Sequence, residues 1–103
     1  MKFSLSSSEF KNSLQSSKSL VAGDLFFKYA VQSKPQLGMI VSRRFGNAVQ
    51  RNLFKRRCRN VFMSVFIREN LNYSVIVHPN KKDLSYAEIQ DSFLHLKKKF
   101  SSE

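Results

Sequence analysis

Two long segments of the chain place their apolar residues at the three- and four-residue spacing of an amphipathic α-helix. Between 48 and 69, the apolar residues that share one side of the helix are Phe54, Cys58, Val61, Phe62 and Val65. After 85, the corresponding residues are Ile89, Phe93, Leu96 and Phe100. Each pattern predicts a helix whose apolar side packs on a core.

Three further signals mark the ends of the predicted helices. Ser85 and Glu88 have the three-residue spacing of a capping box, so the last helix is predicted to begin there. Ser6 and Glu9 repeat that spacing and predict a short first helix over 7–15. The middle helix is predicted to end at the NLN sequence that follows it, because Asn tolerates the left-handed conformation found at helix ends.

The segments between these helices are typical of β-strands. Residues 19–32 predict a hairpin with a Gly-Asp turn. Residues 37–42 are nearly continuously apolar, which predicts a strand at a central position in the sheet, and residues 73–78 predict another buried strand. The resulting order is α-β-β-β-α-β-α, which predicts an α/β two-layer sandwich in one domain spanning 1–103.

The charge of the chain points to a class of partner. Lys and Arg number 18 against 7 Asp and Glu, which gives a net charge of +11. No acid lies between Asp24 and Glu69, whereas seven basic residues, six of them Arg, lie from Arg43 to Arg59. A small domain of this charge repels itself unless a polyanion neutralises it, and Arg suits bidentate phosphate contacts. We therefore expect a nucleic-acid partner.

The middle helix presents a basic face beside its apolar stripe. The residues of this face, at spacings of three and four, are Asn52, Lys55, Arg56 and Arg59. An ordinary solvated face would mix Glu with Lys, because like charges at this spacing destabilise a helix and cations near its N-terminus oppose its dipole. The pattern therefore favours a polyanion-binding surface. Because a strand, and no helix-turn-helix pair, leads into this helix, structured or single-stranded RNA is favoured over DNA.

Other function classes find little support in the residues. The apolar runs are too short to span a bilayer, and the first ten residues lack a signal-peptide core, so we expect a cytoplasmic protein without a membrane partner. Cys58 is expected in the core. The acids form no D-x-D or E-x-x-H cluster, and His78 and His95 have no partner motif. Neither a protein active site nor a protein-bound metal is expected.

The stretch SRRFGNAVQRNLFKRRCR resembles the signature of the protein subunit of bacterial ribonuclease P. The positions that match the family pattern are Ser42, Arg43, Arg44, Gly46, Asn47, Ala48, Val49, Arg51, Asn52, Lys55, Arg56 and Arg59. Leu53 departs from it, since a third basic residue is usual there. We expect the contact of that residue to be lost or to be made by a neighbour such as Arg57.

The resemblance implies that the protein assists a catalytic RNA and has no active site of its own. That RNA, with its own Mg²⁺ ions, would remove the 5′ leader of precursor tRNA, while the protein binds both RNAs. The resemblance also implies a left-handed β-α-β crossover around the basic helix, against the general right-handed rule. The residues implied to bind the catalytic RNA are Arg43, Arg44, Arg51, Asn52, Lys55, Arg56 and Arg59.

The resemblance further implies a cleft between the first helix and the sheet that holds the leader. Phe10, Phe26 and Tyr29 would line this cleft, because bases stack on aromatic rings whatever their sequence. Plain core packing is the alternative for Phe10 and Tyr29. Gly46 would allow a positive φ in the turn before the basic helix, and Asn47 is expected as the N-cap of that helix.

Two other functions remain open at this point. One is a ribosomal or RNA-chaperone protein of related fold that takes no part in cleavage. The other is an independent small nuclease, which the missing carboxylate cluster disfavours.

Overall fold

The computed structural model describes residue 5, residues 18–82 and residues 84–101. The elements within these residues are β1 (Lys18–Ala22), β2 (Leu25–Val31), β3 (Gln36–Met39), η1 (Arg43–Phe45), α2 (Ala48–Phe62), η2 (Met63–Ile67), β4 (Tyr73–Pro79) and α3 (Tyr86–Ser101). The first helix predicted over 7–15, and with it Phe10, lies outside the described residues.

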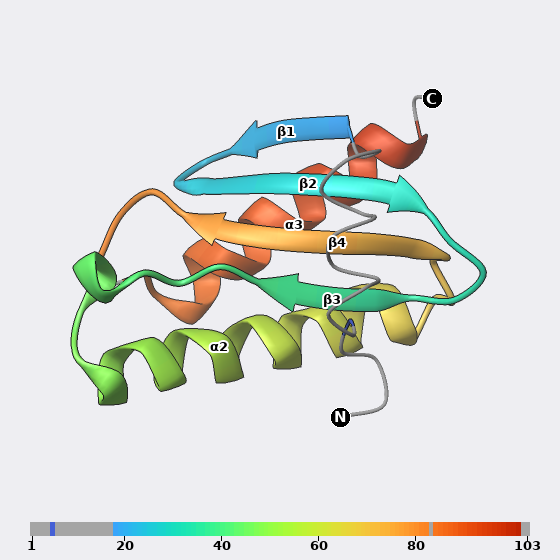
Figure 1. The fold of residues 1–103 in the computed structure, drawn as a ribbon. Coiled ribbons are helices and arrows are strands. Elements are labelled where there is room, and N and C mark those ends of the chain that lie inside the picture. The colour runs from blue at the N-terminus through green and yellow to red at the C-terminus, as the bar shows by residue number, and fades with distance from the viewer. Residues whose placement is uncertain (1–4, 6–17, 83, 102–103) are drawn as a thin grey trace.

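The four strands form one mixed sheet in the order β1-β2-β4-β3 (Figure 1). β1 and β4 each pair antiparallel with β2, whereas β3 runs parallel to β4. The predicted hairpin is confirmed, because Ala22 pairs with Leu25 and the intervening Gly23 has a φ of +60°, which favours glycine. β4 has a neighbour on each side, which agrees with its prediction as a buried strand. The central position predicted for the strand over 37–42 is wrong, because β3 lies at the edge of the sheet and strand order depends on pairing between distant segments, which an apolar run does not specify.

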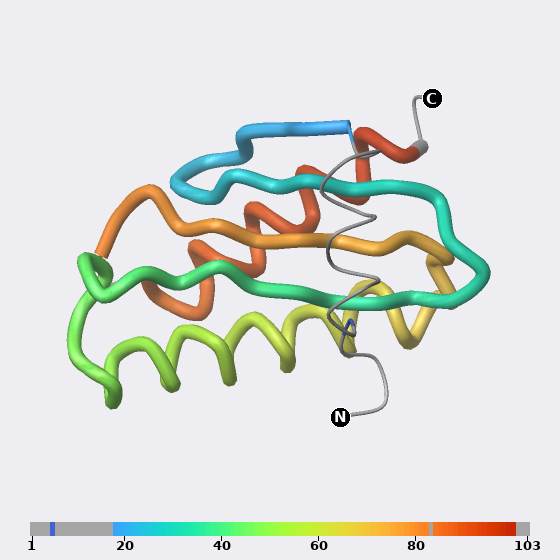
Figure 2. Tube along the Cα trace, in the orientation of Figure 1, coloured from blue at the N-terminus to red at the C-terminus, as the bar shows by residue number. Residues whose placement is uncertain are grey.

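Both helices cover the same face of the sheet and contact each other. In Figures 1 and 2, β3 and β4 run in the same direction, and α2 returns between them on the side where α3 lies behind the sheet. With this placement the β3–α2–β4 connection is left-handed, as the family resemblance implies. The architecture is the predicted α/β two-layer sandwich.

Phenylalanine rings fill the space between the layers. The fully buried rings are Phe27, Phe54, Phe62, Phe66 and Phe93. Phe27 meets Phe93 edge-on with ring centroids 5.1 Å apart, and Phe62 stacks on Phe66 at 4.8 Å. Cys58 of α2 is buried among these residues, as expected, and the burial raises the pKa of its thiol.

Two predicted boundaries move. The strand expected over 37–42 ends at Met39, because the chain turns into the 3₁₀ helix η1, whose N-cap is Ser42. The helix expected over 48–69 is α-helical only to Phe62, where it continues as the π-helical turn η2. Asn70 then adopts a φ of 53°, so the left-handed end predicted for the middle helix is confirmed.

Candidate nucleic-acid interface

α2 begins at a capping box made only of uncharged side chains. Asn47 Oδ1 accepts a hydrogen bond from Gln50 N at 2.9 Å, and Gln50 Oε1 accepts one from Asn47 N at 2.9 Å. Gly46 has a φ of +157°, and a Cβ there would lie 2.1 Å from Gln50 Oε1. The expected N-cap and turn glycine are therefore confirmed, and no acid lies in the first turn of α2.

The surface of α2 that faces away from the core carries cations and no acid. Asn52 and Arg56 are exposed one turn apart, and Arg59 follows them with partial exposure. Together with Val49 and Leu53, these three side chains line a depression of about 480 Å³, which we call the α2 hollow. It contains three of the seven residues predicted to bind RNA.

The other four residues predicted to bind RNA do not line this hollow. Arg51 and Lys55 are half-buried beside the apolar stripe of α2, and Arg43 is exposed in η1. The Nε atoms of Arg51 and Arg59 are buried and have no hydrogen-bond partner in the described part of the chain. Because buried donors are normally paired, these two atoms leave hydrogen-bonding capacity beside the basic face.

Arg44 lines a second depression, where the parallel strands β3 and β4 end. This strand-end hollow has a volume of about 310 Å³, and its lining residues are Ser42, Arg44, Phe45, His78, Pro79, Asn80, Lys81 and Lys82. His78, Lys81 and Lys82 are far from Arg44 in the sequence, and no motif predicted that they lie together. The signal that would have found them is the parallel pairing, since ligand sites form beyond the carboxyl ends of such strands.

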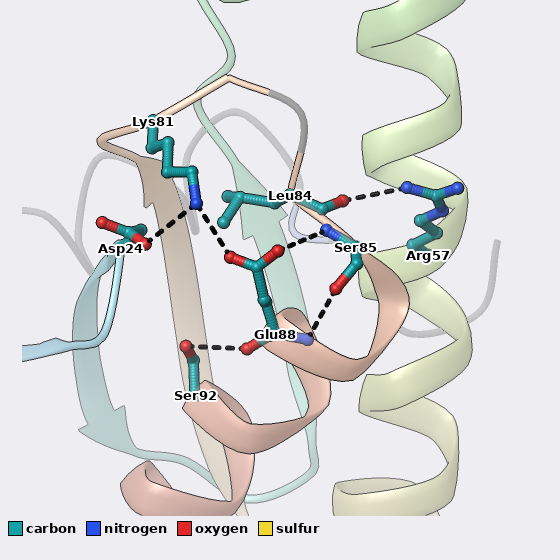
Figure 3. Close-up of polar contacts among 7 residues, drawn as sticks. All are labelled: Asp24, Arg57, Lys81, Leu84, Ser85, Glu88 and Ser92. Atoms are coloured by element: carbon teal, nitrogen blue, oxygen red, sulfur yellow. Dashed lines mark hydrogen bonds and ion pairs between the residues drawn. The ribbon is translucent and has the colours of Figure 1, made fainter.

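Arg57 fastens α2 to the segment that precedes α3 (Figure 3). Its Nη1 donates a partly buried hydrogen bond of 2.9 Å to the carbonyl oxygen of Leu84. Arg57 is not among the residues that line the α2 hollow. The expectation that Arg57 takes over the contact missing at Leu53 is therefore not supported, because this bond directs Arg57 toward α3.

Acidic side chains gather at the other helix (Figure 3). The Nζ of Lys81 lies 3.1 Å from Glu88 and 3.8 Å from Asp24. Ser85 N donates to Glu88 at 3.2 Å and Glu88 N donates to Ser85 Oγ at 3.1 Å, which confirms the predicted capping box of α3. The pKa of Glu88 is lowered, mainly by the hydrogen bond between its carboxylate and Lys81 and then by the hydrogen bonds with Ser85. The hydrogen bond with Glu88 also raises the pKa of Lys81.

The described residues do not assemble the predicted leader cleft. Alternation along β2 places Phe26 and Tyr29 on opposite faces of the sheet. Tyr29 is only 3% exposed, and its ring meets Phe100 edge-on with centroids 5.1 Å apart. The cleft position predicted for Tyr29 is wrong, because its place in the strand alternation directs it, like Phe27, toward α3. Phe26 is partly exposed on the opposite face.

Within 18–82 and 84–101, no three His, Cys, Asp or Glu side chains are grouped so that they would hold a metal ion. In the same ranges, no helix combines the length and the apolar character needed to cross a membrane.

Fold and site together define a small α/β protein in which an acid-free, basic helix packs beside a mixed sheet. A family model described as Ribonuclease P matches residues 5–101. The chain therefore belongs to the ribonuclease P protein family, and the resemblance seen in its basic motif is confirmed.

Individual relatives agree with this assignment. The ribonuclease P protein component of Streptococcus thermophilus is 41% identical over 64 residues, which cover 61% of this chain and 58% of the relative. That of Shouchella clausii is 40% identical over 70 residues, which cover 66% and 57%. The chain thus spans a little over half the length of these curated relatives.

Solved structures share the fold. The RNase P protein of Staphylococcus aureus matches with a TM-score of 0.80 and 26% identity, over 95% of this chain and 94% of that chain. The RNase P protein from Thermotoga maritima matches with a TM-score of 0.75 and 24% identity, over 88% and 90%. The second likeness shows the fold alone.

Proposed function

We propose that this chain is the RNA-binding protein component of a ribonuclease P holoenzyme, which removes the 5′ leader from precursor tRNA. The observation that carries the proposal is the acid-free face of α2, which begins at an uncharged cap and gathers Asn52, Arg56 and Arg59 around one hollow. The family match over 5–101 supports it. A cytoplasmic location is part of the same proposal.

In this proposal the RNA subunit performs the cleavage and holds the Mg²⁺ ions. Three of the described acids are paired with lysines, since Asp24 and Glu88 share the ammonium group of Lys81 and Glu69 pairs with Lys97. The protein instead supplies cations. Arg and Lys side chains replace the counterions of two RNAs, which lowers the mutual repulsion of their phosphates and strengthens their association.

We assign the precursor tRNA to the side of the molecule that carries the strand-end hollow. Arg44, which the resemblance assigns to the catalytic RNA, and Lys82 place positive charge there, next to His78. Phe26 pairs across the sheet with His78 and is partly exposed, so an aromatic ring adjoins these cations. Aromatic rings beside cations are the elements with which proteins bind single strands without sequence preference.

Reconstitution tests the proposed function. The chain is mixed with a bacterial ribonuclease P RNA and precursor tRNA at a low Mg²⁺ concentration. We expect cleavage at the mature 5′ end that requires both the RNA and the protein. Absence of stimulation by the protein would overturn the proposal and favour an RNA chaperone, whereas cleavage without the RNA subunit would indicate an independent nuclease.

The contribution of the basic face is tested by Arg56→Ala. Removal of one phosphate contact should weaken binding to ribonuclease P RNA and reduce the slope of log K against log salt by about 0.7–0.9. Lys98→Ala is the matched control, because Lys98 is an exposed cation on α3. Equal salt slopes for the two variants would show that Arg56 is only solvated.

A further inference from the structure

We propose that the α2 hollow holds one unstacked adenine base of the ribonuclease P RNA. This inference rests on the proposed function and deepens it, since it names what the basic face recognises. The base would lie in the hollow, and the phosphates on either side of it would lie on the basic rim. A face that bound phosphates alone would need cations, but it would need neither apolar walls nor an amide.

The walls of the hollow are apolar where a solvated basic helix would be polar. Val49 and Leu53 stand four residues apart on the same face, and 74% of Val49 is exposed. A β-branched side chain at this exposure neither fills the core nor favours the helix. The volume of about 480 Å³ lies within the roughly 300–1,000 Å³ range of sites for small organic groups. A hollow of this volume with apolar side chains on its wall suits the flat face of a base.

The polar groups of the hollow match a base with phosphates beside it. Asn52 is exposed, and its amide has no hydrogen-bond partner among the described residues, which leaves one donor and one acceptor group for a ligand. An Asn amide pairs with adenine through N6 and N7, one bond in each direction. Arg56 and Arg59 lie on the same face, and the buried Nε of Arg59 has no acceptor among the described residues.

Leu53 makes this hollow a feature of the present chain. A basic residue is usual there in the pattern that the motif resembles, and a cation would line the hollow in place of an apolar wall. Arg57, one turn later, does not restore that cation, because its Nη1 is bonded to Leu84. The hollow therefore keeps an apolar part, formed by Val49 and Leu53, beside the cations of Arg56 and Arg59. A base would contact the apolar part, and the phosphates on either side of the base would contact the cations.

Binding measurements distinguish a base contact from a phosphate contact. For the complex with full-length ribonuclease P RNA, Asn52→Ala should weaken binding between about fivefold and a hundredfold while the salt slope stays that of the wild type, because the amide carries no charge. Asn60→Ala is the matched control, since Asn60 is exposed on α2 outside the hollow. Equal affinities for the two variants would overturn the inference.

Chemical probing of the same complex identifies the base. Diethyl pyrocarbonate modifies N7 of unstacked adenines, so one adenine of the ribonuclease P RNA should be reactive in free RNA and in the Asn52→Ala complex but protected by the wild type. Protection of no adenine, or only of one in the tRNA leader, would overturn the inference while wild-type RNA binding upheld the proposed function. If the wild type did not bind the RNA, the proposed function would fail and the inference with it.

Leu53→Arg tests the apolar wall. The added cation should steepen the salt dependence of RNA binding, because it can contact a further phosphate, and it should also reduce protection of the adenine. Full protection in this variant would overturn the placement of the base against Leu53. Circular dichroism of each variant checks that the fold is kept.

Discussion

The two described α-helices both begin with a capping box, but the box of α2 is uncharged whereas that of α3 contains a carboxylate. At α2 the reciprocal bonds join Asn47 and Gln50, and at α3 they join Ser85 and Glu88. A carboxylate at this position suits the positive end of a helix dipole, and α3 has one. The cap of α2 has the same reciprocal hydrogen bonds but no carboxylate. The backbone N–H groups in its cap are therefore paired without a negative charge from the protein.

This difference separates the part of each helix that packs in the core from the face of α2 that we propose binds RNA. Both helices bury a phenylalanine stripe against the same sheet, and in the core they play equivalent parts. The acids that a basic domain can accommodate stand near α3, where Glu88 and Asp24 pair with Lys81. The face of α2 carries none of them and remains available to a polyanion.

The largest expected effect tests whether the helices are equivalent in the core. Phe54→Ala on α2 and Phe93→Ala on α3 should each lower the free energy of unfolding by about 3–5 kcal/mol, because each ring is almost completely buried. Urea denaturation measures both, and the milder Phe54→Leu and Phe93→Leu changes keep the comparison measurable. A small loss for one helix only would show that it adds little to the shared core.

An exchange of charge between the two caps should have an intermediate effect. Gln50→Glu keeps the capping bond but places a carboxylate beside the proposed RNA-binding face. We expect affinity for ribonuclease P RNA to fall roughly fivefold, the equivalent of one like-charge contact near water. Glu88→Gln should leave that affinity unchanged. Equal affinities for the two variants would contradict the view that the neutral cap of α2 serves binding.

The smallest expected effect concerns pH. Because the folded state lowers the pKa of Glu88, its stabilising contribution is present above the unfolded pKa of about 4.3 and is lost as pH falls through the lower folded value. The difference in unfolding free energy between the wild type and Glu88→Gln should therefore shrink between pH 7 and pH 3. The cap of α2 does not ionise, so Gln50→Ala should cost the same at both pH values. If the difference in unfolding free energy between the wild type and Glu88→Gln were the same at both pH values, the capping bonds of Glu88 would not depend on its charge.

The features predicted correctly from the sequence depend on residues close together in the chain. The core stripe through Phe54 and Cys58 and the N-cap at Asn47 follow from helical spacing and from local hydrogen bonds. Tyr29 was assigned to the cleft from the family resemblance, and the apolar run of Leu25, Phe26 and Phe27 leaves the strand alternation ambiguous. The burial of Leu25 and Phe27 on the side of α3 resolves it and takes Tyr29 into the core.

The sequence by itself determined the charge of the basic helix, the chemistry of its cap and the side that faces the core, because each depends on spacings within a few residues. Only the tertiary structure decided that His78 and Lys82 join Arg44 at the strand ends and that Arg57 reaches Leu84. These contacts depend on strand pairing and helix packing between segments distant in the chain. The tertiary structure also showed that Val49 and Leu53 share one hollow with Asn52 and two arginines. Helical spacing does not specify such a hollow, because its shape depends on the length and direction of neighbouring side chains.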